Sequence, residues 1–184
     1  MDKLLEAIRD FADQAHGDQT RKYTPDRYIV HPVRVMETCR KYEDRFEVLA
    51  AALLHDVVED TAVTNAEIVD FLQTLMPRPQ ALEIARLVLE LTDVYIKKDY
   101  PQLNRKERKE LEAERLGQVS ADAQTIKYAD IIDNCLDILI HEPEFGRKYQ
   151  AEGQAILKLT TEGNPRLYKI ALETVNAVPG NAGA

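Results

Sequence analysis

A short acidic segment at the end of an apolar stretch is the part of the sequence best suited to chemistry. In VLAAALLHDVVEDT, an almost wholly apolar run is followed by His55, Asp56, Glu59 and Asp60. Burying an unpaired carboxylate is heavily penalised, so such residues are either exposed or paired with a cation. Residues four apart share one face of a helix, so His55 would stack with Glu59. Asp56 would stack with Asp60 in the same way, and the segment predicts a divalent-cation site.

Two residues from other parts of the chain are candidates to complete this site. His31 lies at an expected helix start, and Asp130 lies in the apolar-periodic stretch TIKYADIIDNCLDILI. Asn134 follows Asp130 by four residues, so it would share that face and hydrogen-bond a substrate or ligand. Taken singly, His31 is more simply a surface or capping histidine, and Asp133 and Asp137 compete with Asp130. Two imidazoles and two carboxylates together suit Mn²⁺, Fe²⁺ or Zn²⁺.

Helices are the elements expected to position these residues. Apolar residues recur at helical spacing almost everywhere, and no convincing period-two stretch interrupts them. Thr64 and Glu67 form a capping-box pattern, and Pro32, Pro79 and Pro165 sit where first-turn prolines are tolerated. The fold class is therefore all-α. The expected helices lie near residues 2–16, 31–42, 45–59, 64–76, 79–96, 105–117, 120–140, 144–161 and 165–177.

Length and composition indicate one globular domain. The 184 residues are 45% apolar and 30% charged, a profile that is neither disordered nor fibrous. We expect the domain to span residues 1–178, followed by a flexible tail at 179–184 with the sequence PGNAGA.

The net charge and the N-terminal sequence restrict the partners and the compartment. A formal net charge of −8 works against a general affinity for nucleic-acid polymers or anionic membranes. The N-terminus lacks the apolar segment of a secretory signal, and the longest apolar run, residues 48–54, is too short to span a membrane. We expect a cytoplasmic protein with two reduced cysteines, Cys39 and Cys135, that have no CxxC spacing. Homo-oligomerisation is left open.

The polar region Lys97–Arg115 admits two interpretations. It holds a short loop with one proline and then a strongly charged segment. The simpler interpretation is a solvated helix with ion pairs between residues four apart. The alternative is a mobile flap beside a phosphate site.

The four candidate ligands resemble the pattern of the HD superfamily of metal-dependent phosphohydrolases: a distant His, then His-Asp, then a distant Asp. These positions match His31, His55, Asp56 and Asp130. The stretches AHGDQTRKYTPDRYIVHPVRV, ALLHDVVEDT, LELTD and IKYADIIDN more closely resemble the alarmone hydrolase domain of the RelA/SpoT family, over about residues 1–150. The resemblance implies an all-α HD-domain fold and a small enzyme with only the hydrolase activity.

The resemblance also implies roles for individual residues. In that family the His, His-Asp and Asp residues bind Mn²⁺, which would assign His31, His55, Asp56 and Asp130. A Glu-Asp pair assists hydrolysis of a nucleotide 3′-pyrophosphate and matches Glu59 and Asp60. The positions that contact the substrate in that family match Arg21, Lys22, Asn134 and Tyr149.

The implied reaction is hydrolysis of (p)ppGpp to GDP or GTP and pyrophosphate. The chain departs from the family at YTPDR, where a Gly-containing loop is usual, and at Val94 and Tyr95, where a basic residue is expected. Base preference is therefore open, and the alternative is another HD phosphohydrolase acting on (p)ppApp, NADPH or a nucleoside monophosphate. An alternative outside the enzymes is a catalytically silent nucleotide-binding module, or a helical protein that uses the metal for stability. Which of Glu59 and Asp60 acts as general base also stays open.

Overall fold

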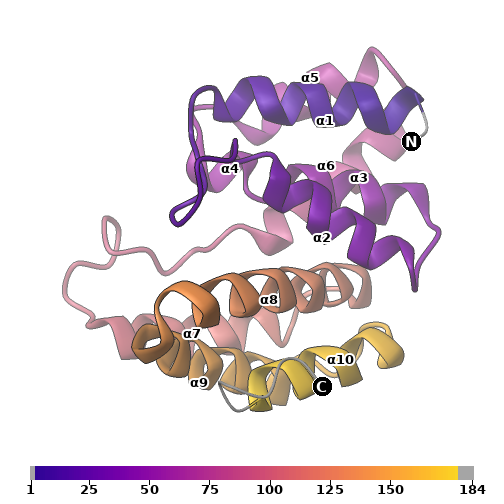
Figure 1. The fold of residues 1–184 in the computed structure, drawn as a ribbon. Coiled ribbons are helices and arrows are strands. Elements are labelled where there is room, and N and C mark those ends of the chain that lie inside the picture. Colours follow the sequence, from indigo (N-terminus) through magenta and orange to yellow (C-terminus); the bar gives the residue numbers. More distant parts are fainter. Residues whose placement is uncertain (1–2, 178–184) are drawn as a thin grey trace. The chain divides into compact units, whose positions relative to one another are not determined.

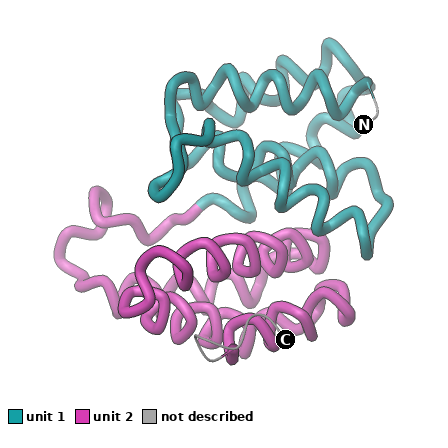
Figure 2. Tube along the Cα trace, in the orientation of Figure 1, with its two compact units in different colours: residues 1–92 teal, residues 93–184 magenta. Residues whose placement is uncertain are grey.

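The computed structural model describes residues 3–177 and divides the chain into two compact units, residues 1–92 and 93–184 (Figure 2). In the described range the secondary structure is helical, with no β-strand beyond an isolated antiparallel bridge between Thr20 and Arg27. This confirms the predicted all-α class. The prediction of one domain over residues 1–178 stays a prediction, and the tail at 179–184 lies outside the described residues.

The first unit is built around one apolar helix. Its helices are α1 (Lys3–His16), α2 (Val30–Arg40), α3 (Phe46–Leu54), α4 (Val57–Asp60), α5 (Asn65–Gln73) and α6 (Arg78–Leu91) (Figure 1). Residues 48–54 of α3 are all buried, and α3 packs against α1, α2 and α6. A helix that is apolar on every face needs neighbours all round. The apolar run thus forms the centre of this unit.

Helix starts and ends in the first unit follow local side-chain chemistry. Thr64 and Glu67 form the predicted capping box, in which the Thr64 N–H donates to the Glu67 carboxylate at 2.8 Å. Pro79 lies in the first turn of α6, as expected. Helix α6 ends at Leu91, earlier than predicted, because Thr92 turns extended and its hydroxyl donates to the Val88 carbonyl at 2.9 Å.

The second unit places one long helix against two others. Its helices are α7 (Arg105–Leu116), α8 (Ala121–His141), α9 (Pro143–Leu159) and α10 (Pro165–Asn176). Helix α8 packs against α9 and α10, and α7 packs on α9 (Figure 1). The buried Glu112 of α7 accepts backbone hydrogen bonds from Val94 at 3.0 Å and Tyr95 at 3.1 Å. This carboxylate therefore fixes the start of the polar loop that precedes α7.

Both cysteines are free thiols in apolar surroundings, as predicted. Cys39 of α2 and Cys135 of α8 are buried. Burial raises the pKa of the Cys135 thiol to about 11. In the described range, no helix combines the length and apolar character needed to cross a membrane.

A glycine contact in the second unit gives a stability prediction. A Cβ on Gly163 would lie 2.6 Å from the Tyr128 ring and 2.9 Å from the Thr125 backbone nitrogen. We expect Gly163→Ala to lower the free energy of unfolding by about 1–3 kcal/mol, because the ring and the backbone must move apart. Urea denaturation measures this loss. The exposed neighbour Glu162 supplies a control, since Glu162→Ala should change stability by less than about 0.5 kcal/mol; equal effects of the two variants would contradict the prediction.

Candidate active site

Three of the four predicted metal ligands meet in the first unit. One nitrogen each from His31 and His55 and one carboxylate oxygen from Asp56 lie within 4.8 Å of one another. The Asp56 carboxylate lies 3.1 Å from His55 Nε2 and 3.5 Å from His31 Nε2. Both imidazoles are buried, at 1% and 3% exposure, and Asp56 is half-buried. These three residues therefore form part of the predicted cation site.

The hydrogen bonding of His55 tests whether this cluster fits a divalent cation. Its Nδ1 lies 2.8 Å from the Ala52 carbonyl oxygen, which can only accept, so Nδ1 carries a proton. In the neutral form of the ring, Nε2 carries a lone pair that faces the Asp56 oxygen 3.1 Å away. Two electron pairs at that distance repel unless a proton or a cation lies between them. The cluster therefore fits a divalent metal, with His55 oriented through its other nitrogen as metal-binding histidines usually are.

The helix break before the acidic residues corrects the expected helix at 45–59. Helix α3 ends at Leu54, and α4 begins at Val57, with His55 and Asp56 in the turn between them. The His55 ring donates a hydrogen bond to the Ala52 carbonyl. This bond competes with backbone hydrogen bonds to the same carbonyl at the end of α3. The Asp60 N–H still donates to the Asp56 carbonyl at 2.9 Å, so the predicted four-residue relation between these two aspartates survives.

A tyrosine connects the metal cluster to the second acidic residue. The Tyr28 hydroxyl lies 2.7 Å from Asp56 Oδ2 and 2.9 Å from Asp60 Oδ2. Burial and the charges of Asp56 and Asp60 raise the pKa of Tyr28 above its usual value, so the phenol keeps its proton. Partial burial, and then the charge of Asp56, raise the pKa of Asp60. A carboxyl group with a raised pKa suits proton transfer nearer to neutral pH.

The other predicted carboxylate, Glu59, lies beside Asp60 in α4 and is exposed. An exposed carboxylate on the same short helix can reach a substrate without moving the buried ligands. Its catalytic role stays a prediction.

The predicted basic pair lies in the loop between α1 and α2. The Arg21 N–H donates to the Asp26 carbonyl at 2.9 Å, which closes the loop next to the Thr20–Arg27 bridge. The Arg21 guanidinium lies over the Tyr28 ring, 5.6 Å from its centroid. Lys22 is exposed. Its amino group donates to the Tyr23 hydroxyl at 3.0 Å. Arg21 is therefore linked through Tyr28 to the metal cluster.

The remaining predicted residues lie in the second unit, where Asp130 of α8 is buried and accepts a hydrogen bond on each carboxylate oxygen. Its Oδ1 accepts from the Asn134 amide at 2.6 Å, and its Oδ2 accepts from Lys127 Nζ at 2.8 Å. Burial opposes the charge of Lys127, but Asp130 and Asp93 raise the pKa of the amine above its usual value. Burial and the charge of Asp130 raise the pKa of Tyr149 on α9. Asp130 as a metal ligand, and Asn134 and Tyr149 as substrate contacts, stay predictions.

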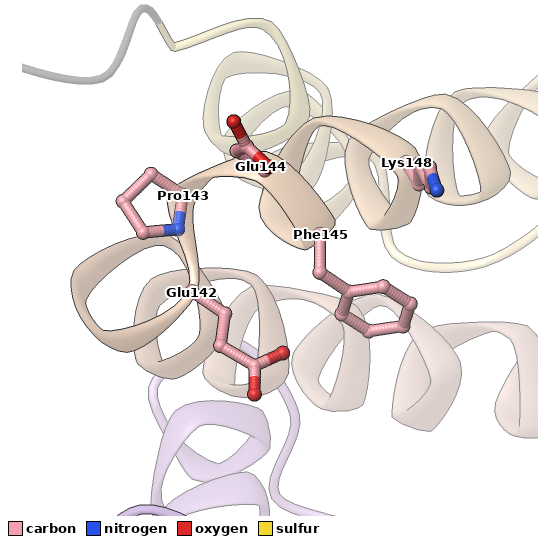
Figure 3. Close-up of a pocket in the computed structure, with 5 residues that line it drawn as sticks. All are labelled: Glu142, Pro143, Glu144, Phe145 and Lys148. Carbon is pink, nitrogen blue, oxygen red and sulfur yellow. The ribbon is translucent and has the colours of Figure 1, made fainter.

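Two hollows in the second unit differ in their relation to these residues. A small pocket of about 60 Å³ is lined in part by Lys127, Tyr149 and Lys109. A larger one of about 450 Å³ lies at the start of α9, where Phe145 and Lys148 line it with Glu142 from the preceding turn (Figure 3). This hollow contains none of the predicted site residues, and neither does a hollow of about 520 Å³ beside α7, so size alone does not identify the site.

Three residues that support the cluster were missed by sequence reasoning. Tyr28, His16 and Gln19 all lie in the stretch AHGDQTRKYTPDRYIVHPVRV, where His16 continues the buried face of α1 four residues after Ala12. His16 is buried, and its ring stacks on Tyr28 with centroids 4.4 Å apart. The position of Tyr28 three residues before His31 was the available signal, since such spacing brings residues to neighbouring positions at a helix start.

Comparisons with known proteins agree with this geometry. The HD domain family model matches residues 28–135, a segment that begins at Tyr28. The human guanosine-3′,5′-bis(diphosphate) 3′-pyrophosphohydrolase MESH1 is 38% identical over 148 residues, which cover 77% of this chain and 73% of the human protein. The Drosophila melanogaster MESH1 is 35% identical, with coverage of 77% and 72%.

A solved structure gives the same result at the level of the fold. A metazoan ortholog of SpoT, described as hydrolysing ppGpp and playing a role in starvation responses, matches with a TM-score of 0.77 and 26% identity. The match covers 95% of this chain and 94% of that one. The chain therefore belongs to the HD domain family, and within that family it groups with the MESH1 proteins.

Proposed function

We propose that this chain is a Mn²⁺-dependent hydrolase that removes the 3′-pyrophosphate of ppGpp and pppGpp, leaving GDP or GTP. The observation that carries the proposal is the buried cluster of His31, His55 and Asp56, with Asp60 joined to Asp56 through one hydroxyl. The named activity of the MESH1 relatives supplies the substrate.

The ligand set includes Asp130 as the fourth member, as the family resemblance implies. We predict that the hydrolase domain spans residues 1–178. When bound, the metal supplies positive charge that polarises a phosphoryl group and makes water easier to deprotonate. Mn²⁺ is our first choice because the family resemblance implies it, and Fe²⁺ and Zn²⁺ are the alternatives because nitrogen and carboxylate ligands suit all three ions.

The protein's own groups would handle the proton and the substrate. Glu59 and Asp60 act jointly, one accepting the proton of the attacking water and the other orienting it or protonating the leaving pyrophosphate. Arg21 and Lys22 hold the nucleotide against a site that is otherwise acidic. The Arg21 side chain already lies over Tyr28, so a phosphate or base bound to it would lie near the cluster.

The substrate test compares several nucleotides with one enzyme preparation. We expect ppGpp to yield GDP and intact pyrophosphate, and ppGpp to be cleaved faster than ppApp. One ester bond is positioned for attack, so the 5′ phosphates stay in place. Anion-exchange separation of the products from ppGpp, ppApp, NADPH and a nucleoside monophosphate, each with Mn²⁺, measures both preferences.

Release of orthophosphate alone would overturn the proposal. Consumption of NADPH or of a monophosphate, with neither alarmone cleaved, would support another HD phosphohydrolase instead. No turnover of any of the four in the presence of Mn²⁺ would favour a binding module.

A further inference from the structure

One phenolic proton lies between two carboxylates that have different tasks in the proposed reaction. The Tyr28 hydroxyl oxygen is 2.7 Å from Asp56, a metal ligand, and 2.9 Å from Asp60, a hydrolytic residue. Both distances are those of good hydrogen bonds to carboxylate. A phenol has one proton to donate, so the two carboxylates share it and are tied to a single oxygen atom.

Tyr28 itself is held on several sides. Its ring stacks on His16 with centroids 4.4 Å apart and planes 29° apart. Its backbone N–H donates to the Gln19 carbonyl at 2.9 Å, and the Arg21 guanidinium lies over its ring. A side chain locked in this way can hold the groups that it contacts to a fixed geometry.

A second connection reaches Asp60 through its backbone. The Gln19 amide nitrogen donates to the Asp60 carbonyl at 2.9 Å, and since that carbonyl can only accept, the orientation of the amide is fixed. The Gln19 amide oxygen therefore faces His16 Nδ1, 3.0 Å away, and Nδ1 carries the proton. His16 is 3% exposed. The His16–Gln19 pair thus fixes the backbone of Asp60 while Tyr28 fixes its carboxylate.

We propose that Tyr28 is a positioning residue that holds the metal ligand Asp56 and the hydrolytic carboxylate Asp60 in one fixed relation. Tyr28 acts through these two carboxylates rather than on the substrate. The kinetic test of this inference rests on the proposed function, whereas the test by metal binding does not depend on which substrate the enzyme uses.

The test variant is Tyr28→Phe, which keeps the ring and its stacking and removes only the hydroxyl. Partners of this kind typically change metal affinity or activity by about 10–100-fold. We expect titration calorimetry to show about tenfold weaker Mn²⁺ binding, and kcat at saturating Mn²⁺ to fall about 10–100-fold with KM changed less than about threefold. Tyr168→Phe is the matched control, because the Tyr168 hydroxyl donates to the Leu157 carbonyl at 3.0 Å in the second unit. It should leave both Mn²⁺ affinity and kcat unchanged.

A double-mutant cycle separates positioning from a general structural effect. If Tyr28 acts on turnover through Asp60, Tyr28→Phe should lower kcat less than about twofold when Asp60→Asn is already present. An undiminished loss in that background would overturn the proposal, as would unchanged Mn²⁺ affinity and kcat in Tyr28→Phe alone. If the wild type binds Mn²⁺ but leaves ppGpp intact, the proposed function fails, and the Mn²⁺ affinity of Tyr28→Phe still decides the role of Tyr28.

Discussion

The double variant Glu59→Gln, Asp60→Asn is expected to lose about 10³-fold in kcat while its affinity for Mn²⁺ stays within about tenfold of the wild type. The amides keep the size and hydrogen-bonding shape of the carboxylates but cannot accept a proton. The metal cluster of His31, His55 and Asp56 is chemically unchanged in this variant. Steady-state kinetics with ppGpp and a calorimetric Mn²⁺ titration on the same preparation measure the two effects.

The control for this variant is a matched pair on α1, Glu6→Gln with Asp10→Asn. Glu6 and Asp10 are four residues apart and lie in the same unit, and their substitution likewise removes two negative charges. They should leave kcat unchanged, which separates the loss of two carboxylates at the site from a change in net charge. Wild-type turnover in the Glu59→Gln, Asp60→Asn variant would refute the assignment of these residues as the proton-transfer pair.

Removing the metal is expected to abolish hydrolysis and to lower the melting temperature, and Mn²⁺ should restore both. A ligand at a hundredfold excess over its Kd stabilises the native state by about 2.7 kcal/mol. For a chain of this length that free energy corresponds to roughly 5–10 °C in Tm. The stabilisation is expected because a cation bound by His55 and Asp56, whose nitrogen and oxygen lie 3.1 Å apart, would attract both ligand atoms. Differential scanning calorimetry with EDTA and then with added Mn²⁺ measures the shift.

Asp56→Ala is the companion variant for metal removal. It deletes the only carboxylate of the three-residue cluster, so added Mn²⁺ should no longer raise the melting temperature. A Mn²⁺-induced shift of wild-type size in this variant would place the metal elsewhere. Full hydrolytic activity in a preparation verified as metal-free would show that the reaction does not need the ion.

Sequence patterns predicted the elements well because most helix signals are local. The capping box of Thr64 and Glu67, the first-turn prolines and the wholly apolar run at 48–54 each depend on a few neighbouring residues. The candidates His55 and Asp56 stand out in the sequence because they follow an apolar run, whereas His31 was chosen for its place at an expected helix start and by the family resemblance. The structure places these three together.

The details that periodicity missed depend on individual side-chain hydrogen bonds. The break between α3 and α4 accompanies the bond from the His55 ring to the Ala52 carbonyl, and no proline or glycine marks it. Tyr28 escaped notice because it follows a polar loop whose course is set by the Thr20–Arg27 bridge and the Arg21–Asp26 backbone bond. Such contacts join residues by their final geometry rather than by a repeating pattern.

The turn between α3 and α4 also bears on how this protein tolerates insertions and deletions. His55 and Asp56 are consecutive residues, so a single peptide bond sets the spacing of their backbones. Consecutive side chains of a helix point about 100° apart, yet His55 Nε2 and the Asp56 carboxylate lie 3.1 Å from each other. Lengthening or shortening the connections at 41–45 or 61–64 would leave this pair intact. Loop lengths in related chains can therefore drift while the dipeptide is inherited as one unit.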